Sequence, residues 1–479
     1  MDINLAPWRL LDALTYLTVG WSVACRPLGG KGDDSLVKII YTFNIVSDMD
    51  TGGGGDSRAE GFVSRLVSET SFIRGNFLLI LIGWLLIDFT REMAFTYYPL
   101  YIRELGGTAA TLGLIGAVST ITEAIIKFPG GYIADKYGRK QIIVTMTFMA
   151  GLCYLVYAFA PNWQTVMLGA ALCSLCWIYT PSHNAIVMDS LPEDKRGTGY
   201  SLVNLITRAS TTPSPLIAGF LLARYDLMAS VRMSFMAVSI AFITASLLRT
   251  RLQETVSDSK PIDAGEVVQS FAGAKVFVEG LGVWGSMSGS VKALLAIDLL
   301  QTVPNVMMNV VFIYFFVDEL GITNVQLSYI GTLIGVFLII FALPVGRIVD
   351  KYGRRKPILF GMALVILVIP FIYDADFVRI ILLTPIIGLL NVVMWTSFSA
   401  LYADMIPPEH RGKASGSKDF FFLVAVTIGQ VAGGWVYDNV SHTLNITIYW
   451  LSMFPVIALS YLFIRDPEPA EAAAEDAQP

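Results

Sequence analysis

Charged side chains lie inside apolar stretches of the sequence, where they could move protons or bind a polar solute. Asp88, Arg91 and Glu92 are three and four residues apart, so one side of a helix would carry all three. Glu123 and Lys127 are four apart in the next apolar stretch. Charge at the middle of a membrane costs about 2.5–3.5 kcal/mol on insertion scales, so such groups usually pair or serve function.

Two carboxylates beside one cation leave one carboxylate able to exchange a proton. We therefore expect Asp88, Glu92 or Glu123 to couple proton movement. The alternative is a structural network in which Asp88 pairs with Arg91 and Glu123 pairs with Lys127, locking helices together. Both interpretations remain open at this point.

Polar side chains on further apolar stretches predict the walls of a cleft. Asp298, Gln301, Asn305 and Asn309 follow helical spacing along one stripe. Three further pairs of polar or aromatic residues are four residues apart: Tyr179 and His183, Asn204 and Arg208, and Asn391 and Trp395. The candidate contacts with a substrate are Arg91, Lys127, Tyr179, His183, Asn204, Arg208, Asp298, Gln301, Asn305, Asn309, Asn391 and Trp395. The competing interpretation is hydrogen bonding between helices, which polar residues often supply in membranes. For Arg208 we favour pairing with a carboxylate, and for His183 a single hydrogen-bonded ring.

The composition requires a membrane around these residues. Of 479 residues, 54% are hydrophobic and 15% are charged, whereas soluble domains carry roughly 25% charged residues. A membrane span needs about 20 apolar residues. Stretches of suitable length occupy 77–101, 111–134, 141–159, 164–188, 198–223, 230–248, 293–317, 325–349, 357–373, 378–403, 414–436 and 446–464. We therefore predict an all-α membrane protein with twelve transmembrane helices.

The distribution of Lys and Arg predicts the orientation, because cytoplasmic loops carry an excess of both. One set of connections is rich in these residues and the opposite set is poor. The rich set holds Lys136, Arg139, Lys140, Lys195, Arg196, Arg249, Arg251, Lys351, Arg354, Arg355, Lys356, Arg411 and Lys413. The poor set holds Arg103, Arg224, Arg232 and Arg379. Both termini are then cytoplasmic, and we expect a multi-pass protein of the cell membrane.

The two groups of six spans repeat one another at an offset of 215 residues. Glu104, Thr108 and Gly116 recur as Glu319, Thr323 and Gly331. The charges at Asp88, Arg91, Glu92, Glu123 and Lys127 do not recur, because the equivalent positions are Val303, Val306, Met307, Leu338 and Ala342. Internal repeats of this kind predict two homologous six-helix bundles around a central cleft, with the charges specialised to the first.

The most similar segments of the repeat are two short loops. Asp135-Lys136-Tyr137-Gly138-Arg139 recurs as Asp350-Lys351-Tyr352-Gly353-Arg354. With the duplication and the twelve spans, these loops make the chain similar to the major facilitator superfamily over roughly residues 76–465.

That resemblance implies a cytoplasmic gate built from the two loops. Arg139 would lie near Asp189 and Arg354 near Asp404, with Asp135 by helix 11 and Asp350 by helix 5. The gate residues it implies are Gly131, Asp135, Gly138, Arg139, Asp189, Gly346, Asp350, Gly353, Arg354 and Asp404. The alternative is that the charges of these loops only anchor a cytoplasmic turn.

The expected domains follow from these boundaries. They are an N-terminal extension that is interfacial or disordered (1–75), an N-terminal bundle (76–248), a central cytoplasmic loop (249–292), a C-terminal bundle (293–465) and a disordered acidic tail (466–479). Residues 1–75 could also reflect a misassigned start, since Met49 would open a shorter chain.

The sequence carries no recognisable catalytic or ATP-binding motif. Four cysteines and three scattered histidines make neither a disulfide framework nor a metal site. We expect no cofactor, no metal and no nucleic acid, and a monomer as the functional unit. The predicted function is secondary transport of a small solute by alternating access, with proton coupling favoured; efflux of drugs or metabolites is one form. A gradient-independent facilitator, an uptake permease and a transporter-like sensor are the alternatives.

Overall fold

The structure, a computed structural model, describes residues 73–191, 196–254, 284, 287–406 and 411–464; the side chains of 127–137, 196–198, 200–201 and 411–415 are not described. The predicted N-terminal extension, most of the central loop and the acidic tail thus lie outside the described residues. All described helices belong to one compact unit, Phe72–Pro479.

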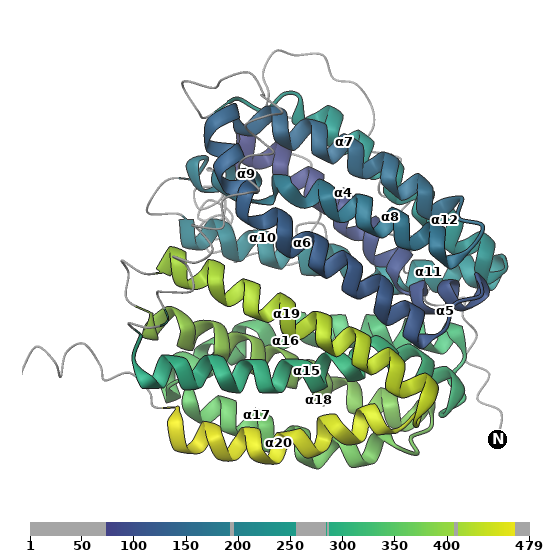
Figure 1. Cartoon of the computed structure of the whole chain (residues 1–479), viewed down its shortest axis with the longest axis vertical. Helices are drawn as coiled ribbons and strands as arrows, with labels where there is room; N and C mark the ends of the chain where they lie inside the picture. The colour runs from purple at the N-terminus through teal and green to yellow at the C-terminus, as the bar shows by residue number, and fades with distance from the viewer. Residues whose placement is uncertain (1–72, 192–195, 255–283, 285–286, 407–410, 465–479) are drawn as a thin grey trace, which may run out of the picture. The chain divides into compact units, whose positions relative to one another are not determined.

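The helices form two successive groups, which Figure 1 draws in purple to teal and in green to yellow. The first contains α4 (Gly75–Phe95), α5 (Tyr98–Glu104), α6 (Ala109–Tyr137), α7 (Arg139–Ala158), α8 (Trp163–Cys176), a 3₁₀ turn (Trp177–Tyr179), α9 (Thr180–Asp189), α10 (Arg196–Thr211), α11 (Ser214–Arg224) and α12 (Leu227–Arg249). The second contains α15 (Gly289–Asp318), α16 (Asn324–Tyr352), α17 (Arg355–Val368), a 3₁₀ turn (Ile369–Ile372), α18 (Phe377–Met405), α19 (Arg411–Asn439) and α20 (Leu444–Phe463). The predicted all-α membrane fold in two bundles is confirmed.

Within the described chain, ten helical segments are long and apolar enough to cross a membrane. The two predicted spans missing from this group are α4 and the α10–α11 pair. α4 carries three charged residues, Asp88, Arg91 and Glu92, close together. α10 and α11 are each too short alone, because the chain breaks between Thr211 and Ser214. Proline lacks an amide hydrogen and clashes with the preceding turn, so Pro213 explains that break.

Two other predicted spans are interrupted helices. The span expected over 77–101 ends as α4 at Phe95 and resumes as α5 at Tyr98, with Pro99 in the first turn of the new helix. The span expected over 164–188 changes from α8 through a 3₁₀ turn into α9, which again begins beside a proline, Pro181. Proline is tolerated in a first turn, where its missing amide hydrogen has no partner to lose.

The repeated sequence forms repeated local structure. Thr108 caps α6 and Thr323 caps α16, each accepting a hydrogen bond from the backbone amide three residues on. The side chains of Thr111 and Gln326 accept in return from the amides of the two capping residues. Such reciprocal capping satisfies amides that a helix start leaves unpaired. The recurrence of threonine at the offset of 215 therefore has a direct structural reason.

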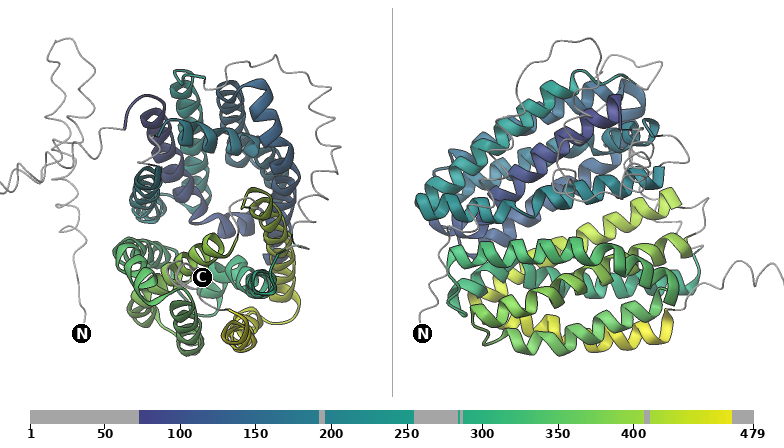
Figure 2. Two further views of the ribbon diagram at one scale, coloured as in Figure 1. Left: turned by 90° about the vertical axis from the view of Figure 1, so that its left-hand side faces the viewer. Right: turned by 180° about the vertical axis from the view of Figure 1, so that it is seen from behind.

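Two equivalent helix pairs join the halves, α6 with α19 and α11 with α16. A side-chain carbon added at Gly113 of α6 would lie 3.6 Å from the Cα atom of Gly434 of α19. At the equivalent contact, a carbon added at Gly219 of α11 would lie 2.2 Å from the hydroxyl of Ser328 of α16. The same two positions of the repeat thus meet twice, and only small residues allow the approach. The two views of Figure 2 agree in placing the bundles side by side.

The halves touch most extensively at one end of the bundle. We call it the latch end; it carries α5 and the start of α6, and the opposite motif end carries Gly138 and Gly353. The largest apolar cluster crosses both halves and includes buried aromatic rings near the latch end: Tyr97, Tyr101, Phe235, Tyr314, Phe315 and Tyr437. Burial of such rings dominates core energetics, so the latch end is the closed side of the structure.

The close approach of α6 and α19 predicts a selective loss of stability when a methyl group is added. A carbon at Gly434 would lie 2.2 Å from the backbone carbonyl oxygen of Ala109, so Gly434→Ala forces the helices apart. We expect a cost of about 1–3 kcal/mol, measured as a lower Tm of the purified protein. Gly416→Ala on the same helix is the control, because nothing lies within 4 Å of an added carbon there. Equal Tm changes would contradict the proposed contact.

Candidate solute path

A cavity of about 600 Å³ lies within the C-terminal half. One wall is the polar stripe of α15 that the sequence predicts, formed by Asp298, Gln301, Asn305 and Asn309. The predicted residues Asn391 and Trp395 of α18 line the same cavity, with α17, α19 and α20 completing it. The structure therefore brings together every C-terminal residue that the sequence analysis singled out for the cleft.

The amides of this cavity are positioned by their own helices. The Asn309 side chain donates to the carbonyl of Asn305 at 2.8 Å and to its side-chain oxygen at 3.0 Å. The Asn391 side chain donates to the carbonyl of Ile387 at 2.9 Å. Each amide group keeps further capacity for hydrogen bonds. The Trp395 ring is 69% exposed and offers an apolar face beside them.

Sequence analysis missed two charged residues of this cavity, Lys418 and Asp419 of α19. The Lys418 ammonium lies 3.9 Å from the ring centre of Tyr402, whose hydroxyl donates to Asp298 at 3.1 Å. These charges lie inside the predicted span 414–436, so the signal that identified Asp88 would also have found them. The cavity thus combines amides, a carboxylate–tyrosine–lysine group and aromatic surface, which suits a solute with both polar and apolar parts.

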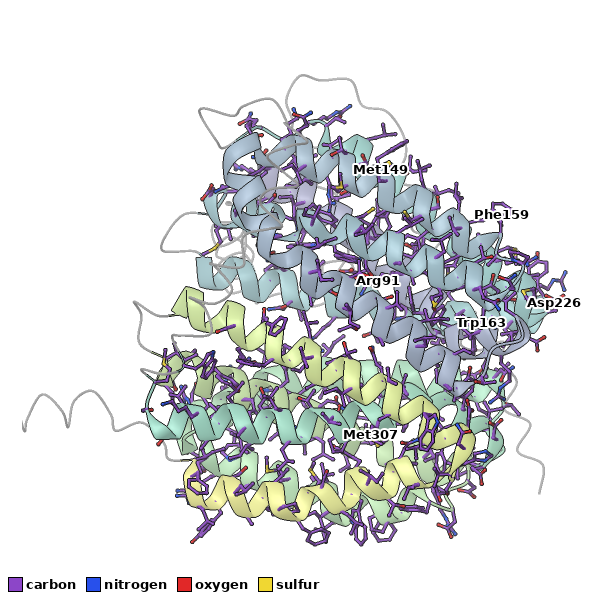
Figure 3. All side chains as sticks on the ribbon, in the orientation of Figure 1. Arg91, Met149, Phe159, Trp163, Asp226 and Met307 are labelled. Atoms are coloured by element: carbon purple, nitrogen blue, oxygen red, sulfur yellow. The ribbon has the colours of Figure 1, made fainter. Side chains whose placement is uncertain are left out.

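The predicted charges of the N-terminal half gather on α4. The Asp88 carboxylate interacts electrostatically with Arg91 and Arg249, and Thr207 of α10 is within its hydrogen-bonding reach. The Arg91 guanidinium lies 5.3 Å from the ring centre of Trp177. Glu92 is exposed and interacts with Arg91 and Asp88. Figure 3 shows Arg91 in the middle part of its half, away from the end that holds Trp163 and Asp226.

Two predicted cleft residues, Tyr179 and His183, are buried within the N-terminal bundle. His183 packs edge-on against Trp84 with ring centres 4.5 Å apart, and its Nε2 atom lies 3.2 Å from Nη2 of Arg249. An arginine only donates, so His183 accepts with Nε2 and is a neutral ring. Neither residue lines the C-terminal cavity.

Of the residues named in the sequence analysis, Arg249 lies farthest from the environment expected for it. Its position after a predicted span suggested a loop cation, but its side chain is fully buried. It is the last residue of α12, and Gly83 of α4 leaves room for its guanidinium.

The remaining predicted residues of this half lie on α6 and α10. Glu123 is half-buried on α6, and Lys127 on the same helix has a side chain outside the described residues. Asn204 is exposed and Arg208 half-buried on α10. Arg208 makes no ion pair with any carboxylate of the described chain, so the pairing expected for it is not present.

At the motif end, the ion pairs implied by the resemblance are present. Arg139 pairs with Asp189, and Nε of Arg354 lies 2.9 Å from a carboxylate oxygen of Asp404. Arg354 also lies 3.5 Å from Asp350. Each arginine follows a glycine with positive φ, 89° at Gly138 and 81° at Gly353, a conformation that side chains disfavour.

Three other residues of this motif lie on α6 and α16. Gly131 lies on α6 and Asp135 follows it, but the Asp135 side chain is outside the described residues. Gly346 lies on α16, where an added carbon would meet nothing within 4 Å.

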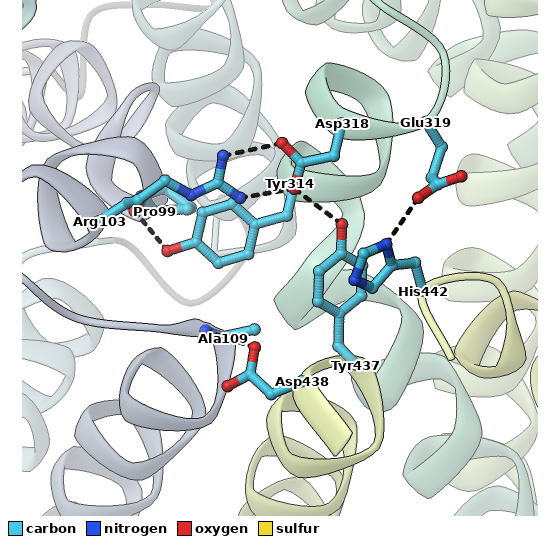
Figure 4. A network of polar contacts seen from close by, with 9 residues as sticks. All are labelled: Pro99, Arg103, Ala109, Tyr314, Asp318, Glu319, Tyr437, Asp438 and His442. Carbon is cyan, nitrogen blue, oxygen red and sulfur yellow. Dashed lines mark hydrogen bonds and ion pairs between the residues drawn. The ribbon is translucent and has the colours of Figure 1, made fainter. Parts of the chain in front are cut away.

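At the latch end, polar contacts join the halves (Figure 4). Arg103 of α5 makes a two-pronged ion pair with Asp318 of α15, at 2.8 and 2.6 Å. The Tyr314 hydroxyl donates to the Pro99 carbonyl at 2.6 Å. Arg103 and Asp318 are 215 residues apart, and so are Pro99 and Tyr314. Equivalent positions of a repeat can touch only near its two-fold axis, so this axis passes through the latch.

Further groups support the latch from α19. Asp438 accepts from the amides of Ala109 and Ala110 at the start of α6, at 3.2 and 2.7 Å. The Tyr437 hydroxyl donates to Asp318 at 3.0 Å, and His442 stacks on the Tyr437 ring. The hydrogen bonds that Arg103 donates to the Asp318 carboxylate raise the pKa of Arg103. An anion at a helix start is stabilised by the helix dipole, so Asp438 ties the halves together through backbone.

Comparison with known proteins fits this arrangement of two bundles. The model of the Major Facilitator Superfamily matches residues 80–308 and 294–479. The chain is a member of the Major Facilitator Superfamily. It is therefore a multi-pass membrane protein and a transporter of small molecules.

Relatives within the superfamily are named as drug exporters. The chain is 22% identical over 402 residues to the multi-drug resistance efflux pump PmrA homolog of Lactococcus lactis, covering 81% of this chain and 94% of the relative. It is 23% identical over 423 residues to the multidrug resistance protein MdtG of Klebsiella pneumoniae, covering 84% and 96%.

Solved structures of the superfamily share the fold. A peptide transporter POT in complex with sulfate has a TM-score of 0.61 at 13% identity, covering 84% of this chain and 96% of that one. The human organic anion transporter MFSD10 has a TM-score of 0.59 at 14% identity, covering 80% and 98%. At these identities the likeness concerns the fold alone.

Loss of the latch ion pair predicts easier opening at the latch end. Asp318→Asn leaves Arg103 with a neutral partner and weakens the closed state by about 1 kcal/mol at most, since the pair is partly exposed. That corresponds to up to about fivefold in population. We expect faster labelling of Asn309→Cys by an impermeant maleimide added at the latch side of sealed vesicles. Asp226→Asn, which neutralises a carboxylate that caps a helix within one half, is the control. Unchanged labelling in Asp318→Asn would contradict the role of the latch.

Proposed function

We propose that the chain is a secondary active transporter that moves a small solute across the cell membrane by alternating access, coupled to protons. The observation that carries this proposal is the cavity of the C-terminal half, with its amide wall of Gln301, Asn305 and Asn309. A solute bound there would become accessible from one side of the membrane or the other as the two halves rock against each other.

The ion pairs at the two ends support alternating access. The latch joins the two halves through Arg103 and Asp318, whereas Arg139–Asp189 and Arg354–Asp404 each lie within one half. Opening at the latch end therefore breaks contacts between halves. We assign the two motif loops to the gate of the other end, where each half keeps its own ion pair as it moves.

Proton coupling is supported by the charges of α4. Asp88 and Glu92 lie near Arg91 on a helix of the N-terminal bundle. Such groups are costly in a membrane and are typical of proton pathways. We propose that Asp88 and Glu92 carry the exchanged proton, and Glu123 on α6 is a third candidate. The amphipathic lining of the cavity and the names of the relatives favour efflux of amphipathic compounds over uptake.

The orientation follows from the loops. Lys and Arg gather at the motif end, which we therefore place in the cytoplasm together with both termini. The latch then faces the outside. We propose a monomer that works without metal or cofactor, since each half supplies one set of gate contacts within a single chain.

The test is transport by purified protein in liposomes with an imposed pH gradient. A panel of fluorescent amphipathic solutes is screened for flux, and internal pH is recorded with a trapped dye. We expect solute movement with matching proton movement, lost in Asp88→Asn and Glu92→Gln. Asp376→Asn is the control, because that carboxylate only caps the start of α18.

Other outcomes identify the alternatives. Solute flux that ignores the gradient would make the protein a facilitator and leave the charges of α4 with a structural role. Binding of solute without flux would indicate a sensor. Flux that needs the gradient inverted would indicate an uptake permease.

A further inference from the structure

Among the described residues, no carboxylate forms an ion pair or hydrogen bond with the buried guanidinium of Arg249. Its Nη1 atom donates to the hydroxyl of Thr147 at 2.6 Å, and Nη2 donates to His183 at 3.2 Å. The ring centre of Tyr179 lies 5.6 Å from its Cζ atom, and Nε has no hydrogen-bond partner among the described residues. Arginine stays charged in proteins, so a full positive charge lies in the bundle with neutral hydrogen-bond partners.

The carboxylate that interacts with this charge is Asp88. Arg91 lies on its other side, so two cations surround one carboxylate. A buried charge that loses its counter-charge is strongly unfavourable. Any change in the charge of Asp88 must therefore change the forces on Arg249.

The partners of Arg249 connect it to the gate motif. Thr147 is on α7 and His183 is on α9. The same two helices are joined at the motif end by the ion pair of Arg139 with Asp189. Thr147 follows Arg139 by about two helical turns, and Asp189 follows His183 by fewer than two. Arg249 thus links α7 and α9 at a point farther from the motif end than the Arg139–Asp189 ion pair.

A second connection runs through the chain that follows Arg249. Asn76 at the start of α4 exchanges two hydrogen bonds with the Gln253 backbone, at 2.9 and 2.8 Å. The Glu254 carboxylate accepts from the amides of Arg139 and Lys140 at 3.1 and 3.0 Å. The segment just after α12 therefore caps the first turn of α7, where the gate arginine lies.

We propose that Arg249 is a positioning residue that transmits the charge of Asp88 to the gate motif at Arg139. When Asp88 is charged, it holds the guanidinium toward α4, and α7 and α9 keep the spacing that the Arg139–Asp189 pair needs. When Asp88 is neutral, Arg249 relies on Thr147 and His183 alone and shifts between these helices. The inference rests on the proposed function, because it assigns the route by which protonation would reach the gate.

Several ionisable groups face this site from the surrounding helices. They are Asp88, Arg91 and Glu92 on α4, Tyr154 on α7, Tyr179 on the 3₁₀ turn before α9, and His183 on α9. Of these, Asp88 is the carboxylate that interacts directly with Arg249. It is therefore the group to change in a test.

The test measures hydrogen exchange of the full-length protein in lipid nanodiscs, which needs no known solute. The reporters are the amides of Arg139 and Lys140, which are protected by Glu254. We expect Asp88→Asn to speed their exchange by about fivefold, at the low end of coupling between sites. In an Arg249→Met background, Asp88→Asn should have no further effect. Arg249→Lys keeps the charge and should keep part of the response.

The control is Asp298→Asn, which neutralises a membrane carboxylate of the other half and should leave these amides unchanged. An equal response to Asp88→Asn with and without Arg249 would overturn the proposal, and so would no response in the wild type. If Arg249→Met does not fold, Thr147→Val combined with His183→Phe removes the two partners instead, with the same expectation. A protein that shows this coupling but no proton-driven flux would contradict the proposed function while leaving the role of Arg249 intact.

Discussion

The meeting of the two halves at small residues governs the rest of the structure. Gly113 of α6 faces Gly434 of α19, and Ser328 of α16 faces Gly219 of α11. The same positions of the repeat are used twice, so small residues allow close approach at both contacts between the halves. The latch near the two-fold axis works only because the backbones approach so closely.

The two halves share the same fold but carry different polar side chains. The N-terminal half holds its charges inside the bundle, where Arg91 and Arg249 face Asp88. The C-terminal half has a cavity of about 600 Å³ lined by amides and aromatic rings. The positions equivalent to Asp88 and Glu92 are Val303 and Met307, so the charged group of α4 has no counterpart in the repeat. The proposed roles in proton coupling and solute binding therefore fall to different halves.

The sequence predicted the features that depend on local pattern. The duplication and the span lengths follow from residue type and spacing, and the ion pairs of the motif loops follow from the family resemblance that those loops carry. The cavity stripe of α15 was also predicted, because helical spacing places Asp298, Gln301, Asn305 and Asn309 on one side. These are properties of single helices or of the repeat itself.

Features that depend on packing between distant helices could not be predicted in this way. Arg249 follows a span and resembles any loop cation, and only the packing of α12 against α4 and α7 buries it. His183 was expected as a candidate cleft residue, but it lies against Trp84 within the bundle. The Arg103–Asp318 pair needs the two-fold axis to be placed in space. Helix breaks at Thr96 and at the 3₁₀ turn before α9 depend on neighbouring helices as well as on proline.

The central claim, that the halves rock so that the latch end and the motif end open alternately, is tested most directly by two distances measured in one protein. One pair of spin labels would replace the exposed residues Tyr225 and Val440 at the latch end, and another would replace Arg251 and Phe463 at the motif end. Pulsed electron resonance in nanodiscs over a range of pH gives both distance distributions. The account predicts that conditions which lengthen one distance shorten the other. Distances that stay constant, or that change independently, would contradict it.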